Sequence, residues 1–233
     1  MVEFSSEFEV EFIQGTGTDA IVAAAARVST GLNLDEYSTE DNAKLISYLM
    51  KHRHGSPFEH GSMTFRISAP IFVFREFMRH RIGWSYNETS ARYKQLDPKF
   101  YVYPEERPLI QDGSSAHPNL VAGTPHMTEN VNGRLELLYG DAWNAYTSMI
   151  EDGVAYEVAR AVLPVGIYSE MYVTCNARSL MAFLSLRVDA ENARFETKPQ
   201  WEIEQVAKNM EEYFALLYPA TYDSFNNHGR VAP

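Results

Sequence analysis

The sequence predicts an α+β fold, a single mixed α/β domain with a central sheet and long helices, on three observations. Residues 62–68 alternate strictly between polar and apolar side chains, which is the period of a strand. Residues 128–152 are expected to form one long helix that ends before a glycine. The stretch 104–128 is rich in Pro, Gly, Ser and Asn and is expected to be a long surface loop, not a linker, so residues 1–233 are expected to form one domain.

The first quarter of the chain is expected to hold one strand and two helices. Phe4–Ile13 alternates in part and predicts an opening strand. Asp19 is expected to cap an alanine-rich helix, narrow enough to pack closely against a neighbour. Ser38 and Asp41 form a capping-box pattern at the start of a helix that runs to about His52.

Three further helices follow from proline positions and apolar spacing. Pro70 is expected to open a helix that continues to about residue 79. Residues 156–163 are expected to form another helix, which Pro164 ends. A polar stretch over 191–199 precedes the last long helix, expected over 200–217.

A strand and a capped helix are expected between these elements. Ile167–Cys175 alternates as a strand, and Ser169 breaks its pattern. Asn176 is expected to be the N-cap of the helix that follows.

Composition restricts the class of protein. With 45% hydrophobic and 22% charged residues the chain is expected to fold around a core. Its net charge of -11 argues against a general nucleic-acid binder, but not against one nucleotide held in a local basic pocket. The chain has a single cysteine, its N-terminus is unlike a signal peptide, and it has no apolar run of about 20 residues. These features predict a cytoplasmic protein without a membrane segment.

The most informative stretch is Arg79–Tyr93, with sequence RHRIGWSYNETSARY. It concentrates three arginines and a histidine among hydroxyl, amide and carboxylate groups in an acidic chain. An arginine grips phosphate or carboxylate with two parallel hydrogen bonds. A solvated helix face would instead mix Lys with Arg at helical spacing. The stretch therefore predicts a pocket for a small anion, most simply a phosphate.

Other chemistries are weaker interpretations of these residues. Ser90 has no His or Lys beside it in sequence, so a phosphate-binding hydroxyl is preferred to a nucleophile. Cys175 lies on the apolar side of its strand and is expected to be a buried, inert thiol. His52, His54 and His60 match no zinc spacing, so no metal is expected.

Three later arginines are also candidates for an anion site. Arg160 lies near a helix end, where it either complements the helix dipole or faces a ligand. Arg178 and Arg187 have apolar neighbours, which predicts partial burial, and a buried arginine needs a partner. No carboxylate lies close by before Asp189, so an anionic ligand is a candidate for that partner.

Four motifs in the same order resemble those of the flavin-dependent thymidylate synthases. They are RHR at 79–81 followed by Ser90 and ARY at 91–93, the HGSPFEH loop at 54–60, ARAVLP at 159–164 and NARSLMAFLSLR at 176–187. The resemblance covers most of the chain, from about Ala20 to the last helix. It implies the family's mixed α/β fold and homotetramer, in which subunits share each active site. It also implies formation of dTMP from dUMP, with methylenetetrahydrofolate as carbon donor and FAD reduced by NADPH as hydride source.

The resemblance also implies roles for individual residues. Arg187 is expected to be catalytic, because a fixed guanidinium favours negative charge developing on the uracil ring. The residues expected to bind dUMP are Glu76, Phe77, Met78, Arg79, Glu88, Thr89, Ser90, Ala91, Arg92, Arg160 and Arg187. Those expected to bind FAD are Ser56, Arg79, His80, Arg81, Glu88, Asn176, Ala177 and Arg178.

The chain departs from the family pattern at four places. Eight residues, not the usual seven, separate RHR from Ser90, which predicts a local bulge near Gly83. Ala182 replaces a frequent Asn that contacts FAD, and Glu76 replaces a frequent Gln. The longer VDAENARFETKPQ at 188–200 replaces a short His-Ala-Gln stretch.

Two alternatives to the enzyme remain. One is a flavin- or nucleotide-binding protein that has reduced or lost turnover, which the departures favour. The other is an RNA-binding module that stacks bases on Tyr86, Tyr93 and Tyr101, which the acidic net charge disfavours.

Overall fold

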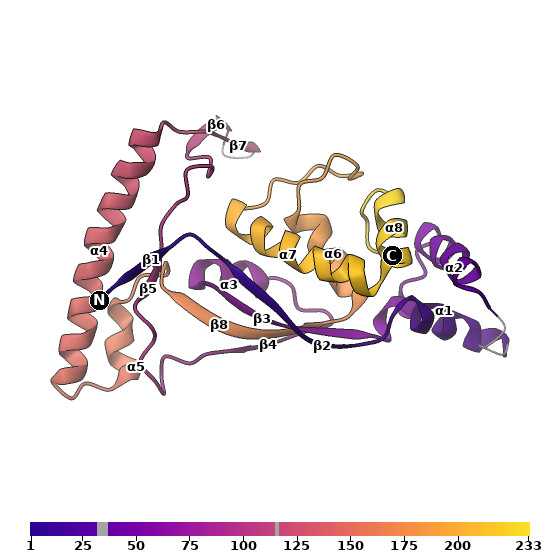
Figure 1. Cartoon of the computed structure of the whole chain (residues 1–233), viewed down its shortest axis with the longest axis horizontal. Helices are drawn as coiled ribbons and strands as arrows, with labels where there is room; N and C mark the ends of the chain where they lie inside the picture. Colours follow the sequence, from indigo (N-terminus) through magenta and orange to yellow (C-terminus); the bar gives the residue numbers. More distant parts are fainter. Residues whose placement is uncertain (32–36, 115–116) are drawn as a thin grey trace. The chain divides into compact units, whose positions relative to one another are not determined.

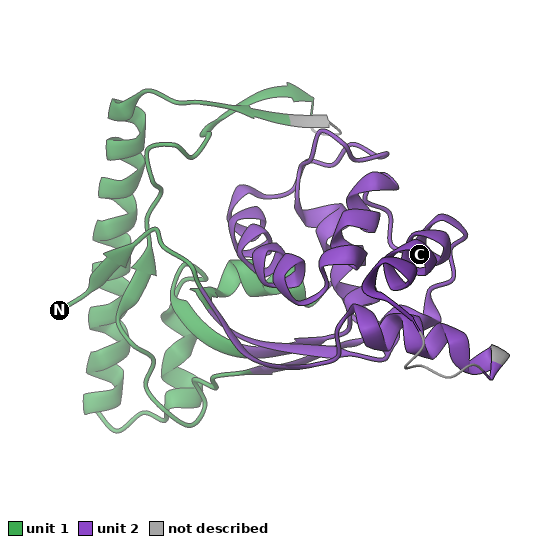
Figure 2. Cartoon of the chain, turned by 45° about the vertical axis from the view of Figure 1, so that its right-hand side comes forward, with its two compact units in different colours: residues 1–9, 68–78, 88–171 green, residues 10–67, 79–87, 172–233 purple. Residues whose placement is uncertain are grey.

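The computed structural model describes residues 1–31, 37–114 and 117–233, which form two compact units (Figure 2). Unit 1 consists of Met1–Glu9, Ser68–Met78 and Glu88–Met171, and unit 2 of Val10–Ile67, Arg79–Asn87 and Tyr172–Pro233. Each unit is therefore assembled from three segments that are far apart in the sequence. No helix in the described ranges is long and apolar enough to cross a membrane.

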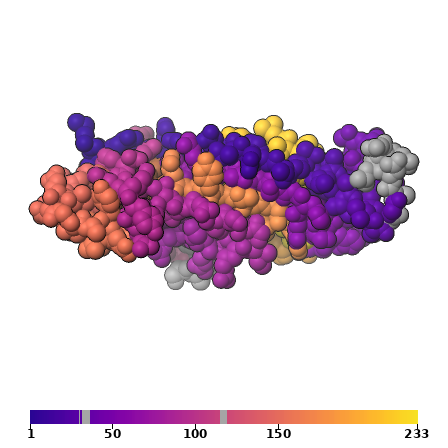
Figure 3. All heavy atoms as spheres, turned by 90° about the horizontal axis from the view of Figure 1, so that it is seen from below, coloured from indigo at the N-terminus to yellow at the C-terminus, as the bar shows by residue number. Residues whose placement is uncertain are grey.

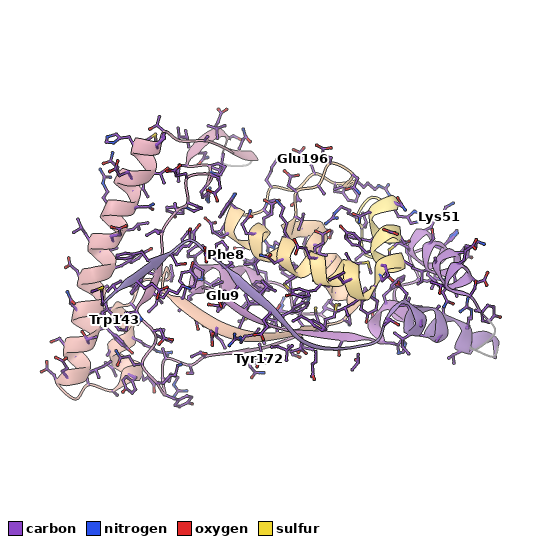
Figure 4. The ribbon with its side chains drawn as sticks, in the orientation of Figure 1. Phe8, Glu9, Lys51, Trp143, Tyr172 and Glu196 are labelled. Atoms are coloured by element: carbon purple, nitrogen blue, oxygen red, sulfur yellow. The ribbon has the colours of Figure 1, made fainter. Side chains whose placement is uncertain are left out.

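Unit 1 is built around a long helix, α4 (Pro125–Glu151), with two short strands beside it (Figure 1). Strand β1 (Glu3–Ser5) pairs in parallel with β5 (Lys99–Tyr101). Phe100 of β5 stacks on Tyr139 of α4 at 4.8 Å between ring centroids and meets Trp143, labelled in Figure 4, at 6.2 Å. Burial of these rings attaches α4 to the paired strands.

The other elements of unit 1 surround this core. They are α3 (Ile71–Phe77), the antiparallel hairpin β6 (Ile110–Ser114) and β7 (His117–Val121), α5 (Tyr156–Ala159) and the 3-10 turn Arg160–Val162. Backbone bonds tie the start of α3 to the segment before β8: Ile71 N–H donates to the Ile167 carbonyl at 3.0 Å and Phe72 N–H to that of Val165 at 3.1 Å.

Unit 2 contains a four-stranded sheet in the order β2-β3-β8-β4. The strands are β2 (Glu9–Thr16), β3 (Ser62–Pro70), β4 (Trp84–Glu88) and β8 (Tyr168–Cys175). One end of each strand belongs to unit 1: Glu9 of β2, Ser68–Pro70 of β3, Glu88 of β4 and Tyr168–Met171 of β8. Met63, Phe65 and Ile67 of β3 are fully buried, as their alternation predicts.

Helices cover one face of this sheet. α6 (Ala177–Arg187) and α7 (Trp201–Leu217) lie over it in Figure 1, and Tyr213 of α7 packs on Phe12 and Phe65. On the opposite face, Arg66 pairs with Glu11 at 2.9 Å, and Tyr172, labelled in Figure 4, is 48% exposed. The remaining helices are α1 (Asp19–Arg27), the 3-10 turn Val28–Thr30, α2 (Thr39–Lys51), the 3-10 turn Ser56–Glu59 and α8 (Pro219–Asn227).

Several elements differ from the prediction. The opening strand is two strands, β1 and β2. The loop predicted at 104–128 contains the β6–β7 hairpin and the start of α4, while its residues 115–116 lie outside the described ones. The α8 helix after Pro219 was not predicted at all.

The cap predicted at Asp19 was assigned to the wrong helix. Thr18 is the N-cap of α1, and its side chain accepts from Ala20 N–H. The Asp19 carboxylate instead accepts from Ala220 N–H at 2.7 Å and from Thr221 N–H at 3.0 Å, in the first turn of α8. It therefore satisfies amide donors of a helix about 200 residues away, a contact that local pattern does not reveal.

Candidate functional site

A cavity of about 260 Å³ lies within unit 1, the green unit of Figure 2, and is called here the unit-1 cavity. Its polar wall is formed by Glu88, Thr89, Ser90, Arg160 and Ser169. Its apolar wall is formed by Ile71, Ala91, Leu96, Leu163, Val165 and Ile167. A cationic and hydroxyl-bearing rim over an apolar wall suits a ligand with a flat ring and an anionic group.

Strand pairing positions the polar wall. Thr89 N–H, directly after β4, donates to the Glu170 carbonyl of β8 at 2.8 Å, which aligns Glu88 with Ser169. The chain then turns: Tyr93 N–H donates to the Ser90 carbonyl at 3.2 Å, and Arg92 N–H to Ser90 Oγ at 3.3 Å. The magenta segment around these residues reaches the surface seen in Figure 3.

In this wall the Glu88 carboxyl has a shifted pKa, and the neighbouring Ser169 hydroxyl lacks a standard hydrogen bond in the described part of the chain. Desolvation raises the pKa of the Glu88 carboxyl, and the neighbouring Ser169 hydroxyl partly opposes this by lowering that pKa. Ser169 is only 5% exposed, and its Oγ makes no hydrogen bond of standard geometry in the described part of the chain.

A second cavity, of about 600 Å³, lies within unit 2 and is called here the unit-2 cavity. The turn before β4 and the N-terminal half of α6 form most of it. Its lining is Arg53, Glu59, Arg79, His80, Arg81, Ile82, Gly83, Trp84, Asn176, Arg178, Ser179, Ala182, Ala232 and Pro233. The donors in this set, guanidinium, amide and hydroxyl groups, are those that proteins use to hold a diphosphate.

Gly83 allows the turn before β4 to approach α6 closely. Its φ is +71°, and a Cβ at this position would come within 2.1 Å of Ser179 Oγ and 2.8 Å of Asn176 Nδ2. Ser179 Oγ also donates to the Ile82 carbonyl at 2.8 Å. The chain therefore makes a left-handed turn against the helix N-terminus, at the place where the extra residue of the RHR-to-Ser90 spacing is expected.

His80 and Arg187 form a pair in unit 2. Arg187 Nε donates to His80 Nε2 at 3.1 Å, and the imidazole packs edge-on against Phe183. Burial and the nearby Arg187 charge lower the pKa of His80 to about 4, so the ring is neutral at pH 7. Because Nε2 accepts from Arg187, the ring proton belongs on Nδ1.

Arg178 has partners that the sequence did not suggest. Its Nη1 donates to Glu59 at 2.5 Å and its Nε to the Pro233 carbonyl at 2.6 Å. The carboxylate sought near this arginine thus comes from the 54–60 loop. The partial burial expected of both arginines is confirmed: the Arg178 side chain is 44% exposed, and Arg187 is half-buried.

Four cavity arginines have no acidic partner among the described residues, although Asp and Glu outnumber Lys and Arg by 31 to 20 in the chain. In the ranges that the structure describes, no ion pair is found for Arg53, Arg79, Arg81 or Arg160. Clustered, unpaired guanidinium groups at a concave wall favour anionic ligands.

The predicted site residues divide among three places. Glu88, Thr89, Ser90, Ala91 and Arg160 line the unit-1 cavity. Arg79, His80, Arg81, Asn176 and Arg178 line the unit-2 cavity. Neither wall includes Ser56, Glu76, Phe77, Met78, Arg92, Ala177 or Arg187.

Some residues outside both walls have other described contacts. Phe77 and Ala177 are fully buried. Arg92 pairs with Glu157 at 3.1 Å and lies over the Tyr93 ring at 5.3 Å. The Cys175 prediction is confirmed: the thiol is 1% exposed, and burial raises its pKa.

Sequence interpretation missed several wall residues. Ser169 carried a signal, since it interrupts the alternation of its strand, and Glu59 lies inside a quoted motif. Trp84 and Ser179 also lie inside quoted motifs, whereas Arg53 carried no signal, because only tertiary packing brings it to the unit-2 cavity.

Fold and cavities together define an α+β protein with two arginine-bearing cavities suited to phosphorylated ligands. The chain belongs to the family of the thymidylate synthase complementing proteins, whose model matches residues 11–220. The fold class and the family resemblance drawn from the motifs are both confirmed.

Relatives and a solved structure are similar over the full length of the chain. The flavin-dependent thymidylate synthase of Streptomyces coelicolor is 53% identical over 236 residues, which cover 100% of this chain and 96% of the relative. That of Tropheryma whipplei is 47% identical over 233 residues, covering 99% and 97%. The crystal structure of the UMP/dUMP methylase PolB from Streptomyces cacaoi bound with 5-Br dUMP has a TM-score of 0.94 at 44% identity and covers 100% of both chains.

Proposed function

We propose that this protein is a methyltransferase that makes dTMP from dUMP as a flavin-dependent thymidylate synthase. Methylenetetrahydrofolate is the carbon donor, FAD is the flavin, and NADPH reduces it. The unpaired Arg160 at the rim of an apolar cavity carries the proposal, since it offers a phosphate site beside a wall that suits a pyrimidine ring.

The nucleotide is assigned to the unit-1 cavity. Arg160 and the Ser90 hydroxyl are the phosphate donors, and the Glu88 carboxylate accepts from a hydroxyl or ring N–H of the nucleotide. At about 260 Å³ the cavity is near the lower end of ligand sites, about 300 Å³. This size matches a nucleoside monophosphate whose phosphate remains at the rim.

The flavin is assigned to the unit-2 cavity. Arg79, Arg81 and Arg178 supply charge for the diphosphate, and Asn176 and Ser179 supply amide and hydroxyl groups. The volume of about 600 Å³ lies within the range of cofactor sites, so the residues present fit the group. When bound and reduced, FAD supplies the hydride that completes the methyl group.

Arg187 lines neither cavity, so it is assigned the catalytic role at an active site that subunits of the tetramer share, and His80 holds it. The neutral His80 ring accepts from Arg187 Nε, which restrains the guanidinium plane without adding a second positive charge. A restrained guanidinium stabilises negative charge as it develops on the uracil ring. The ligand contacts expected of Ser56, Arg92, Ala177 and residues 76–78 stay predictions, since these residues line neither cavity.

The expected partners complete the proposal: a homotetramer in the cytoplasm that uses dUMP, folate and NADPH and binds no nucleic-acid polymer. The test is a visible absorbance spectrum of the purified protein, followed by NADPH and dUMP without air and by chromatography for dTMP. Flavin bands that bleach faster with dUMP, together with dTMP formed only when methylenetetrahydrofolate is added, support the proposal. A protein that binds no FAD refutes it.

One observation favours the alternative of a binding protein without turnover. Ala182 lines the unit-2 cavity at a position where the family resemblance implies an Asn that contacts FAD, and an alanine side chain offers a flavin no hydrogen bond. Flavin that bleaches and nucleotide that binds, with no dTMP after addition of folate, identifies this alternative.

A further inference from the structure

We propose that Ser169 is a positioning residue of the unit-1 cavity, whose hydroxyl holds the Glu88 carboxylate where it accepts a hydrogen bond from the nucleotide. This inference rests on the proposed function, because it concerns how the nucleotide is bound in that cavity.

The first support is the burial of a polar group that lacks a partner. Ser169 is 5% exposed and lines the unit-1 cavity, and its Oγ has no hydrogen bond of standard geometry to any residue the structure describes. Buried hydroxyl groups are nearly always bonded, since leaving one unpaired costs free energy. An unpaired hydroxyl at a cavity wall therefore points to a partner acquired when the cavity fills.

The second support is the position of Glu88. The bond from Thr89 N–H to the Glu170 carbonyl, 2.8 Å, fixes the end of β4 against β8 and keeps Glu88 beside Ser169. The hydroxyl acts on this carboxyl, because it lowers the pKa that desolvation raises. In this proposal the hydroxyl gains its partner, the Glu88 carboxylate, when the nucleotide binds.

Other charged groups surround this pair. Arg160 lines the same cavity. An adjoining cavity of about 270 Å³ shares Thr89, Leu96 and Ser169, and its charged lining is Glu3, Glu9, Lys94, Asp97, Lys99 and Glu170. Substitution at Ser169 leaves all of these in place, so a change in pH dependence between variants reports Glu88.

The chemistry predicts which way the pH dependence moves. The ionised carboxylate is an acceptor for the N–H and O–H donors of a uracil nucleotide, and its protonation removes that capacity. Without the Ser169 hydroxyl the pKa of Glu88 rises further, so protonation begins at a higher pH. As the pH is lowered, a variant without this hydroxyl therefore loses nucleotide binding at a higher pH than the natural protein does.

The experiment measures the dissociation constant of dUMP for the flavin-loaded protein between pH 5 and pH 8.5. Ser169→Ala is expected to bind dUMP about fivefold more weakly at neutral pH, and the loss of dUMP binding at acidic pH is expected to begin at a higher pH. In turnover, KM for dUMP should rise by a larger factor than kcat falls. Ser169→Thr, which keeps the hydroxyl, is expected to follow the natural protein.

Two variants separate this role from a structural one. Ser224→Ala is the matched control, since Ser224 of α8 is 4% exposed, has an Oγ without a partner in the described ranges, and lines neither cavity. Ser169→Cys keeps the shape of the side chain with only a weak hydrogen-bond donor. It is expected to show the weakened dUMP binding predicted for Ser169→Ala, and it serves as the test if the alanine variant does not fold.

The outcomes distinguish the inference from the proposed function. If Ser169→Ala and Ser169→Cys match Ser224→Ala at every pH while the natural protein binds dUMP, the role of Ser169 is refuted and the enzyme proposal stands. If the natural protein itself binds no dUMP, the proposed function fails first.

Discussion

Replacing Arg160 with Ala removes the only guanidinium that lines the unit-1 cavity in the described part of the chain. A hydrogen bond to a charged group contributes about 1.5–3 kcal/mol, which corresponds to about 10- to 150-fold in binding. Arg160 is exposed, so solvent screening places the expected loss of dUMP affinity near the lower end, about tenfold. The free energy of unfolding should change by less than about 0.5 kcal/mol, as is usual for a surface side chain.

The assay compares dUMP with deoxyuridine, which lacks the phosphate. Arg160→Ala should weaken dUMP binding and leave deoxyuridine binding unchanged, and the salt dependence of dUMP binding should become shallower. Arg134→Ala is the control, since Arg134 is also exposed in unit 1 but lies on α4 outside both cavities. An equal loss for dUMP and deoxyuridine, or no loss for either, would refute a phosphate role for Arg160.

Three other predictions follow from unit 2. Arg187→Ala should abolish dTMP formation while circular dichroism and thermal unfolding stay near normal, and measurable turnover close to that of the natural protein would end its assignment as catalytic. Gly83→Ala should destabilise the fold by about 1–3 kcal/mol, because a Cβ there would lie 2.1 Å from Ser179 Oγ and the φ of this residue is +71°. Gly140 lies in the middle of α4, and a Cβ there would have nothing within 4 Å. Gly140→Ala should therefore stabilise the protein by about 0.5–1 kcal/mol, and denaturant unfolding measures both changes. The pKa of His80 in the folded protein is about 4, below the ordinary 6.5, so the unfolded chain binds more protons between these two pH values. The free energy of unfolding should therefore fall as the pH drops from 6.5 toward 4. The fall should be smaller in His80→Asn. Equal pH slopes for both proteins would contradict the depressed pKa.

Local chemistry explains the elements that were predicted correctly. The capping box of Ser38 and Asp41 starts α2 as expected, since both of its hydrogen bonds lie within four consecutive residues. Asn176 caps α6 through a bond from Ser179 N–H to its Oδ1 at 2.8 Å, again a local interaction. The alternation of Met63, Phe65 and Ile67 is the direct consequence of a strand with one face in the core.

The errors arise where distant segments decide the outcome. The Asp19 carboxylate caps a helix near residue 220, and β1 finds its partner in β5, almost 100 residues on. Ser169 interrupts an apolar pattern on the buried side of β8, and only the structure shows that a cavity lies there. Propensity acts over a few residues, so it carries no record of such partners.

For the site, the sequence alone determined the chemistry and the structure determined the grouping. The motifs identified the arginines, the Glu88–Arg92 segment and the family, because residue types and spacing are present in the chain before it folds. Folding decided that Glu88 to Ala91 meet Arg160 and Ser169 around one cavity, while Arg79 to Arg81 meet Asn176 and Arg178 around another. It also gave Arg187 its His80 partner and Arg178 its Glu59 partner, across 107 and 119 positions of sequence. Those contacts, and the shifted pKa values of His80 and Glu88, depend on burial and distance, which exist only once strands and helices from separate segments have packed together.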